Sequence, residues 1–230
     1  NQHKTYVIAA VGFETTAPAY ALMLQEAKRR GMDNIRLVTA LKMAIPALDW
    51  ICTNQEDIAG FICPGHVSVI TGSASYEPLA EKYGKPFVVT GFEAEHILAS
   101  LYRLVKQVEE GKGYVENLYK NAVKPEGNVK ALKVMNEVYE TGPAMWRGLG
   151  IISDSGLYLR KEYEMYDGGS RELFADMELP EGCRCGDVIV GRLNPDQCPM
   201  FGKACTPVKP FGPCMVSSEG ACGIWYRNVT

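Results

Sequence analysis

Apolar positions in the first 150 residues alternate between two kinds of segment. Short runs rich in β-branched residues are typical of strands, and longer stretches with apolar residues at helical spacing follow them. This repeated order predicts an α/β fold built on a doubly wound, Rossmann-like and mostly parallel sheet. The predicted strands are Tyr6–Val11, Ile35–Ala40, Ile58–Cys63 and Pro86–Thr90, and the predicted helices cover roughly 18–30, 46–52, 76–83 and 94–110.

The pattern changes towards the C-terminus. Val129–Glu140 predicts one more helix, whereas Met145–Leu159 indicates strand or irregular structure. From Gly182 onward Pro and Gly recur every few residues, and no run suits an ordinary helix before the end of the chain. We therefore expect an α/β domain over residues 1–147 and a small Gly-, Pro- and Cys-rich domain over 148–230. The second domain needs an internal staple, because such a segment cannot build an apolar core.

Composition and charge exclude several classes of partner. The 230 residues are 47% hydrophobic and 22% charged, with a formal net charge of -3, so no basic field gathers nucleic acid or an anionic membrane. No segment approaches the roughly 20 apolar residues of a membrane span, and Asn1–Lys4 does not begin a signal peptide. We expect a soluble cytoplasmic protein. The chain opens without methionine, which suggests a fragment or a processed product.

Three turns that follow predicted strands carry the candidate chemistry, because ligands bind beyond the carboxyl ends of parallel strands. They are Gly12–Pro18, Pro64–Ser68 and Gly91–Glu93. We expect them to share one sheet edge if their strands are parallel. Capping is the plainer alternative for Thr16 and Glu93, since threonine and carboxylate side chains often cap helices. His66 lies close to Cys63 in the second turn, so an exposed imidazole beside a thiol is a candidate proton carrier or ligand.

Cysteine placement is the most informative feature of the composition. Six of the eight cysteines fall near the C-terminus, at Cys183, Cys185, Cys198, Cys205, Cys214 and Cys222. Metal binding or thiol redox chemistry is favoured over a disulfide framework, because nothing suggests export. A [4Fe–4S] cluster needs four thiolates, which leaves two for another task.

Our hypothesis divides these thiols into two groups. Side chains two residues apart on an extended chain point oppositely, so Cys183 and Cys185 should not both face one cluster. We assign the cluster to Cys183, Cys198, Cys205 and Cys222, and a nearby dithiol or disulfide to Cys185 and Cys214. A structural zinc site is the alternative, although the absence of a CxxC knuckle disfavours it.

Three separated strings resemble the HypD family of hydrogenase formation proteins. They are Gly12-Phe13-Glu14-Thr15-Thr16-Ala17-Pro18, Cys63-Pro64-Gly65-His66-Val67-Ser68 and Cys214-Met215-Val216-Ser217-Ser218-Glu219-Gly220-Ala221-Cys222. The resemblance spans essentially the whole chain. It departs at the start, since the family's N-terminal Gly-Pro-Gly-Cys-Pro-Val-Cys type motif and its iron-holding cysteine are not in this sequence.

The resemblance implies a thiol-redox scaffold for the Fe(CN)2CO group of [NiFe]-hydrogenase, carrying a [4Fe–4S] cluster. HypC-like and HypE-like proteins would be its partners. By similarity, Glu14, Thr15, Thr16 and His66 would line the cleft where the iron group is built, and Glu219 would lie near the cluster. Two other functions compete with this one. One is a zinc- or disulfide-stapled interaction module without redox chemistry, and the other is a hydrolase that uses His66 with Glu14.

Overall fold

The computed structural model describes residues 3–172 and 179–229 and divides the chain into two compact units. Unit 1 consists of Asn1–Pro143 and Ser153–Arg171, and unit 2 consists of Ala144–Ile152 and Glu172–Thr230. Unit 1 therefore takes in a segment beyond the predicted boundary at residue 147. The mixed α/β class with parallel strands is confirmed, and so is the cysteine-rich C-terminal region.

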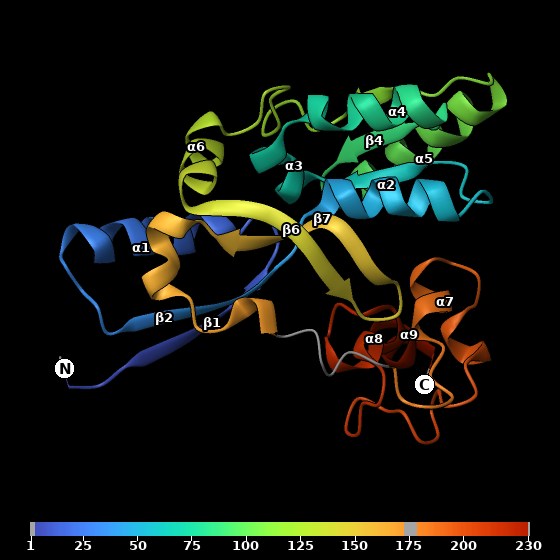
Figure 1. Cartoon of the computed structure of the whole chain (residues 1–230). Helices are drawn as coiled ribbons and strands as arrows, with labels where there is room; N and C mark the ends of the chain where they lie inside the picture. Colours follow the sequence, from blue (N-terminus) through green and yellow to red (C-terminus); the bar gives the residue numbers. More distant parts are fainter. Residues whose placement is uncertain (1–2, 173–178, 230) are drawn as a thin grey trace. The chain divides into compact units, whose positions relative to one another are not determined.

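The first part of unit 1 is a parallel strand pair covered by helices. Strands β1 (Tyr6–Gly12) and β2 (Ile35–Leu41) pair in register from Tyr6 opposite Ile35 to Gly12 opposite Leu41. Figure 1 shows helix α1 (Ala17–Arg29) over this pair. Buried side chains of these elements join those of α6 (Val129–Val138) in one apolar core. The two strands and the helix predicted for this region are confirmed to within two residues.

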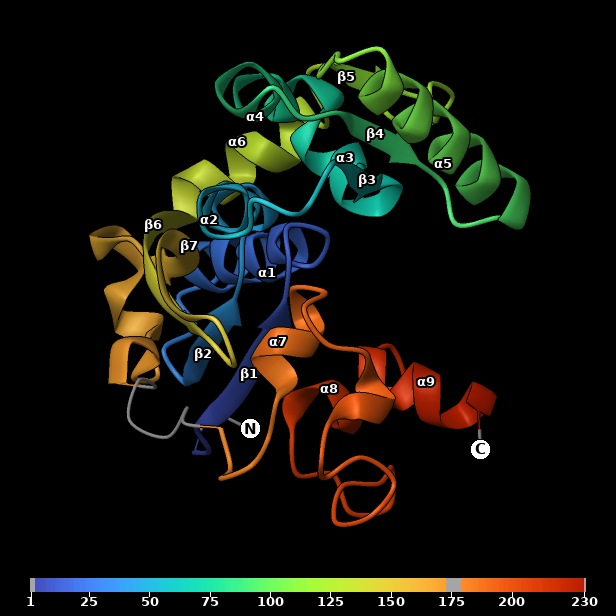
Figure 2. The same ribbon diagram turned by 90° about the vertical axis from the view of Figure 1, so that its right-hand side faces the viewer.

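The second part of unit 1 is a three-stranded parallel sheet with its own core. Strands β3 (Phe61–Pro64), β4 (Phe87–Thr90) and β5 (Val115–Asn117) lie in that order, with Phe61 opposite Phe87 and Pro64 opposite Thr90. Figure 2 shows these strands between α4 on one side and α5 on the other. The helices of this part are α2 (Ala44–Asn54), α3 (Gly65–Thr71), the 3-10 turn η1 (Ser73–Tyr76), α4 (Glu77–Tyr83) and α5 (Ala94–Glu109).

The pairing of the strands differs from the prediction in one respect. The turns after β3 and β4 share an edge, as expected, but the turn after β1 follows a strand of the other sheet. The predicted loop after Pro64 is also wrong, because α3 begins there at Gly65. Local periodicity marks a segment as strand or helix, but pairing depends on contacts between residues far apart in the sequence.

The last secondary structure is a strand pair and a set of short helices. Strands β6 (Tyr139–Trp146) and β7 (Gly150–Leu159) pair with each other, and the 3-10 turns η2 (Lys161–Tyr166) and η3 (Ser170–Glu172) follow. The predicted helix ends at Val138 rather than Glu140, because β6 begins at Tyr139. Unit 2 contains α7 (Cys185–Ile189), η4 (Pro195–Gln197), α8 (Pro213–Val216) and α9 (Ala221–Val229).

In residues 3–172 and 179–229 no helix has both the length and the apolar character needed to cross a membrane.

Candidate functional site

Glu14 is the most unusual polar residue of unit 1, because its side chain is almost completely buried, with 1% of its surface exposed. It leaves the end of β1 and accepts a hydrogen bond at Oε1 from the backbone N–H of Ala44, 2.8 Å away at the start of α2. Its other oxygen, Oε2, has no hydrogen-bond partner among the described residues. Burial raises the pKa of Glu14, although hydrogen bonds from the backbone of Glu14 and Ala44 oppose the rise.

A buried tyrosine connects Glu14 with the motif that follows β3. The hydroxyl of Tyr76 lies 2.9 Å from Oγ of Ser68, which also donates to the carbonyl of Pro64. Burial raises the pKa of Tyr76, and the negative charges of Cys63 and Glu14 add to the rise. The charge of Glu14 thus acts on a tyrosine that is bonded to the Pro64–Ser68 segment. Sequence reasoning missed Tyr76, because nothing local distinguishes it from an ordinary core aromatic residue.

The other residues predicted around Glu14 are exposed. Thr15 and Thr16 are both exposed after β1, and the Thr16 hydroxyl donates to the carbonyl of Phe13 at 3.1 Å. The capping alternative is wrong for Thr16, since its side chain makes no capping hydrogen bond at the start of α1. It is also wrong for Glu93, which precedes α5 without such a bond.

Lys42 is a candidate that sequence reasoning missed. It is half-buried directly after β2, and burial lowers its pKa. Because ligands bind beyond the carboxyl ends of parallel strands, its position at a strand end is the signal that could have identified it.

His66 stands in the first turn of α3 with its ring 4.8 Å from that of Phe92, so the turns after β3 and β4 are in contact. Cys63, by contrast, is buried in the core, and burial raises its pKa. The thiol of Cys63 is therefore a core group and not an accessible neighbour of the His66 ring. Within residues 3–172 the structure shows no hydrogen bond or ion pair between His66 and Glu14.

A second histidine at the same edge was not among the predicted residues. His96 Nδ1 lies 2.7 Å from Oε2 of Glu93, and its ring is 5.9 Å from that of Tyr119. Both His96 and Tyr119 line a pocket of about 550 Å³ beside the end of β5. Its position in the first turn after β4 is the signal that could have identified His96, by the same strand-end rule.

The six C-terminal cysteines form the thiol cluster of unit 2. Four of them belong to its apolar core, and Cys183 packs against that core. All six are free thiols, and only Cys183 is not fully buried. The members of the thiol cluster are Cys183, Cys185, Cys198, Cys205, Cys214 and Cys222. A segment too rich in Gly and Pro to form an ordinary core is therefore organised around sulfur.

Short structural elements bring these cysteines together. Cys185 begins α7, Cys214 lies in α8 and Cys222 lies in α9. Position 212 favours glycine, because a Cβ atom there would lie 2.5 Å from Sγ of Cys183 and one of the two would have to shift. The packing of the cysteines thus depends on a close approach of backbone to sulfur.

The thiols interact strongly with one another. Cys214 Sγ lies 3.1 Å from Cys222 Sγ, and its hydrogen bonds with Cys185 and then with Cys222 lower the pKa of Cys214. The same bond with Cys214 raises the pKa of Cys185, and burial raises that of Cys222. Negative charge on Cys198 or Cys205 raises the pKa of both Cys183 and Cys222. Each of the six sulfurs therefore lies within electrostatic reach of at least one other sulfur of the thiol cluster.

The remaining predicted residue is Glu219, which is exposed in the loop between α8 and α9. Its backbone N–H donates to Oγ of Ser217 at 3.0 Å. Across residues 3–172 and 179–229, no three or more His, Cys, Asp or Glu side chains form a group that could hold a metal ion.

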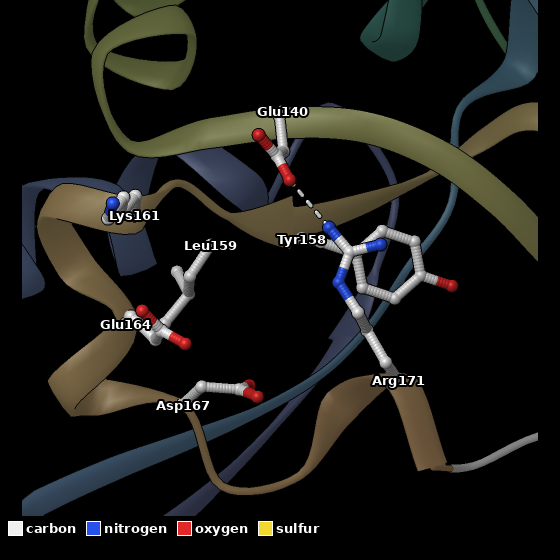
Figure 3. A pocket seen from close by; sticks show the side chains of 7 residues that line it. All are labelled: Glu140, Tyr158, Leu159, Lys161, Glu164, Asp167 and Arg171. Carbon is white, nitrogen blue, oxygen red and sulfur yellow. Dashed lines mark hydrogen bonds and ion pairs between the residues drawn. The ribbon is translucent and has the colours of Figure 1, made fainter.

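A separate pocket of about 440 Å³ on unit 1 contains none of the predicted residues (Figure 3). An ion pair of 2.5 Å joins Arg171 to Glu140, and the Arg171 guanidinium lies 4.5 Å from the centre of the Tyr158 ring. The lining residues are Glu140, Tyr158, Leu159, Lys161, Glu164, Asp167 and Arg171. Because most of its charged groups are exposed, this pocket is a polar surface feature.

The fold and the thiols define a class of protein: an α/β unit with strand-end motifs joined to a small unit whose core is built from cysteines. Residues 1–229 match the profile of the family described as "HypD: Hydrogenase formation hypA family". The chain belongs to the HypD family.

Curated relatives agree with this assignment. A Methanocaldococcus jannaschii protein named for hydrogenase expression and formation is 41% identical over 226 residues, which cover 97% of this chain and 63% of the relative. The hydrogenase maturation factor HypD of Rhodobacter capsulatus is 40% identical, covering 99% of this chain and 62% of that protein. HypD of Escherichia coli is 37% identical, with 99% and 62% covered. The chain thus spans less than two thirds of these relatives.

Proposed function

We propose that the chain takes part in hydrogenase maturation as an iron–sulfur, thiol-redox scaffold for the Fe(CN)2CO group. The observation that carries the proposal is the thiol cluster, in which six free cysteines converge in one small unit. The chain belongs to a family whose relatives are named hydrogenase maturation factors, and this membership supports hydrogenase maturation as the process. We place this activity in the cytoplasm, where reducing conditions keep thiols free.

Unit 2 contains six free cysteines, and a [4Fe–4S] cluster is held by four thiolates. We assign Cys183, Cys198, Cys205 and Cys222 as its ligands. When bound, the cluster supplies one-electron transfer. The protein's part is to exclude water from the sulfurs, and the burial of Cys198, Cys205 and Cys222 supports that role.

Cys185 and Cys214 are the proposed redox pair. The hydrogen bond between their side chains supports this pairing, because two thiols must be neighbours to form a disulfide. Thiol–disulfide exchange with an external disulfide would form the Cys185–Cys214 bond and reduce that disulfide to two thiols, and exchange with an external dithiol would reopen it. The lowered pKa of Cys214 favours it as the thiolate that attacks.

Unit 1 would hold the iron group as substrate. Its Rossmann-like character is part of the proposal and is supported by the parallel strands β3 to β5 with helices on both sides. Glu14, Thr15, Thr16 and His66 are the proposed cleft residues. The buried carboxylate of Glu14, with its unpartnered Oε2, is the strongest candidate to accept a hydrogen bond or proton there. HypC-like and HypE-like proteins are the proposed partners.

Iron, acid-labile sulfide and zinc per chain, measured on protein purified without oxygen, test the first part of the proposal. We expect about four irons and four sulfides. Replacing Cys198 with Ser should abolish iron binding, whereas Cys185→Ser should retain it and Cys52→Ser, in unit 1, should leave it unchanged. One zinc without sulfide would instead support the stapled interaction module. Equal iron retention in the Cys198 and Cys185 variants would refute the assignment of ligands.

A further inference from the structure

Helix α5 exposes large apolar side chains instead of burying them. The α5 apolar stripe consists of Leu98, Leu101, Tyr102, Val105 and Val108. Between 46% and 67% of each of these side chains is exposed, whereas the polar residues Ser100 and Gln107 of the same helix are buried. Soluble proteins rarely expose a continuous apolar strip of this kind except where another molecule binds.

The spacing of the stripe suits a second helix. Leu98, Leu101, Val105 and Val108 are separated by three, four and three residues, the pattern of a helix–helix seam. Along the whole seam α5 is an unbroken helix, and Figure 2 shows it on one side of strands β3–β5. A rigid helix with a two-heptad seam provides a surface for one amphipathic helix.

The charges at the ends of the stripe favour a helix of another protein over a second copy of this chain as the molecule that binds there. Glu95 and Glu109 are exposed on the stripe's side of α5, and neither has an ion pair among the described residues. The nearby cation Lys106 acts on Glu110, whose pKa it helps to lower. An antiparallel second copy would place Glu95 opposite Glu109 at both ends, and such like-charge contacts are unfavourable.

We propose that the α5 apolar stripe is a docking surface for an amphipathic helix of a partner protein, with an apolar seam and Lys or Arg near both ends. The apolar seam of the partner helix would bury the α5 apolar stripe, and the Lys or Arg side chains of the partner would form ion pairs with Glu95 and Glu109. This inference is independent of the thiol cluster, because all of its residues lie in unit 1.

Fluorescence anisotropy with the full 230-residue chain tests the proposal. The probe is a labelled synthetic helical peptide of three heptads with a Leu seam and Lys at the flanking end positions. A second peptide carries Glu in place of Lys. We expect the Lys peptide to bind, and the double variant Leu98→Ser/Val105→Ser to bind it about tenfold more weakly. Leu22→Ser on α1 is the matched control, since Leu22 is equally exposed apolar surface, and it should bind normally.

Charge reversal gives a second test. The variant Glu95→Lys/Glu109→Lys should prefer the Glu peptide, reversing the selectivity of the original chain. Failure of both peptides to bind, or equal binding of both by the original chain, would overturn the proposal. A dimer in sedimentation analysis that dissociates in the Leu98→Ser/Val105→Ser variant would also overturn it, because the occupant would then be a second copy.

Discussion

Replacing Glu14 with Gln should make the chain more stable at alkaline pH. Glu14 is buried, and only Oε1 has a hydrogen-bond partner, the N–H of Ala44. Gln keeps that acceptor and the shape of the side chain but removes the charge. Burial raises the pKa of Glu14 from its ordinary value of 4.5, so the folded state binds the proton more tightly than the unfolded state.

The sign of the pH dependence follows from this raised pKa. The stabilisation by the bound proton is fully present below pH 4.5 and is lost as the pH rises through the folded-state pKa of Glu14. Each unit by which burial raises this pKa corresponds to about 1.4 kcal/mol of stability that Glu14 loses once it is ionised. For a chain of this size, about 2–4 °C of Tm corresponds to each kcal/mol, so the Gln variant should melt on the order of 5 °C higher at pH 8.

Thermal unfolding followed by circular dichroism from pH 5 to pH 8 measures the effect. The difference in Tm between the two proteins should shrink as the pH is lowered. Glu95→Gln is the matched control, because Glu95 is exposed on α5, and it should follow the original chain throughout. A difference independent of pH, or a Gln variant less stable at pH 8, would refute the reasoning.

Two further substitutions test the contacts at each candidate site. Tyr76→Phe removes the hydrogen bond to Ser68 and should destabilise unit 1 by about 0.5–1.5 kcal/mol, measured by urea unfolding, and an unchanged midpoint would show that the bond contributes nothing. Gly212→Ala should lower the iron content of anaerobically prepared protein, because the new methyl group would lie 2.5 Å from Cys183 Sγ, whereas Val208→Ala, at an almost fully exposed position of unit 2, should retain its iron. Full iron in the Gly212 variant would contradict the tight packing of the cysteines.

Local pattern was sufficient to predict most of the elements. The alternation of apolar runs located β1, α1, β2, α4, β4 and α5 to within a few residues, because each segment's periodicity reports on its own backbone conformation. The clustering of cysteines also followed from the sequence, since a Gly- and Pro-rich segment has few other ways to form a core. Local pattern missed α3, whose short Gly-His-Val-Ser start resembles a turn.

Long-range contacts decided the rest. Only the tertiary structure shows that β1 and β2 form a different sheet from β3 to β5. It also shows that Ser153–Arg171 belongs to unit 1. It also makes Glu14 a buried carboxyl, links its charge to Tyr76, and places Cys214 between Cys185 and Cys222. The sequence by itself determined most of the longer helices and strands and which residues carry reactive groups. Their pairing, burial and pKa shifts arise from neighbours distant in the chain, and local periodicity contains no information about those neighbours.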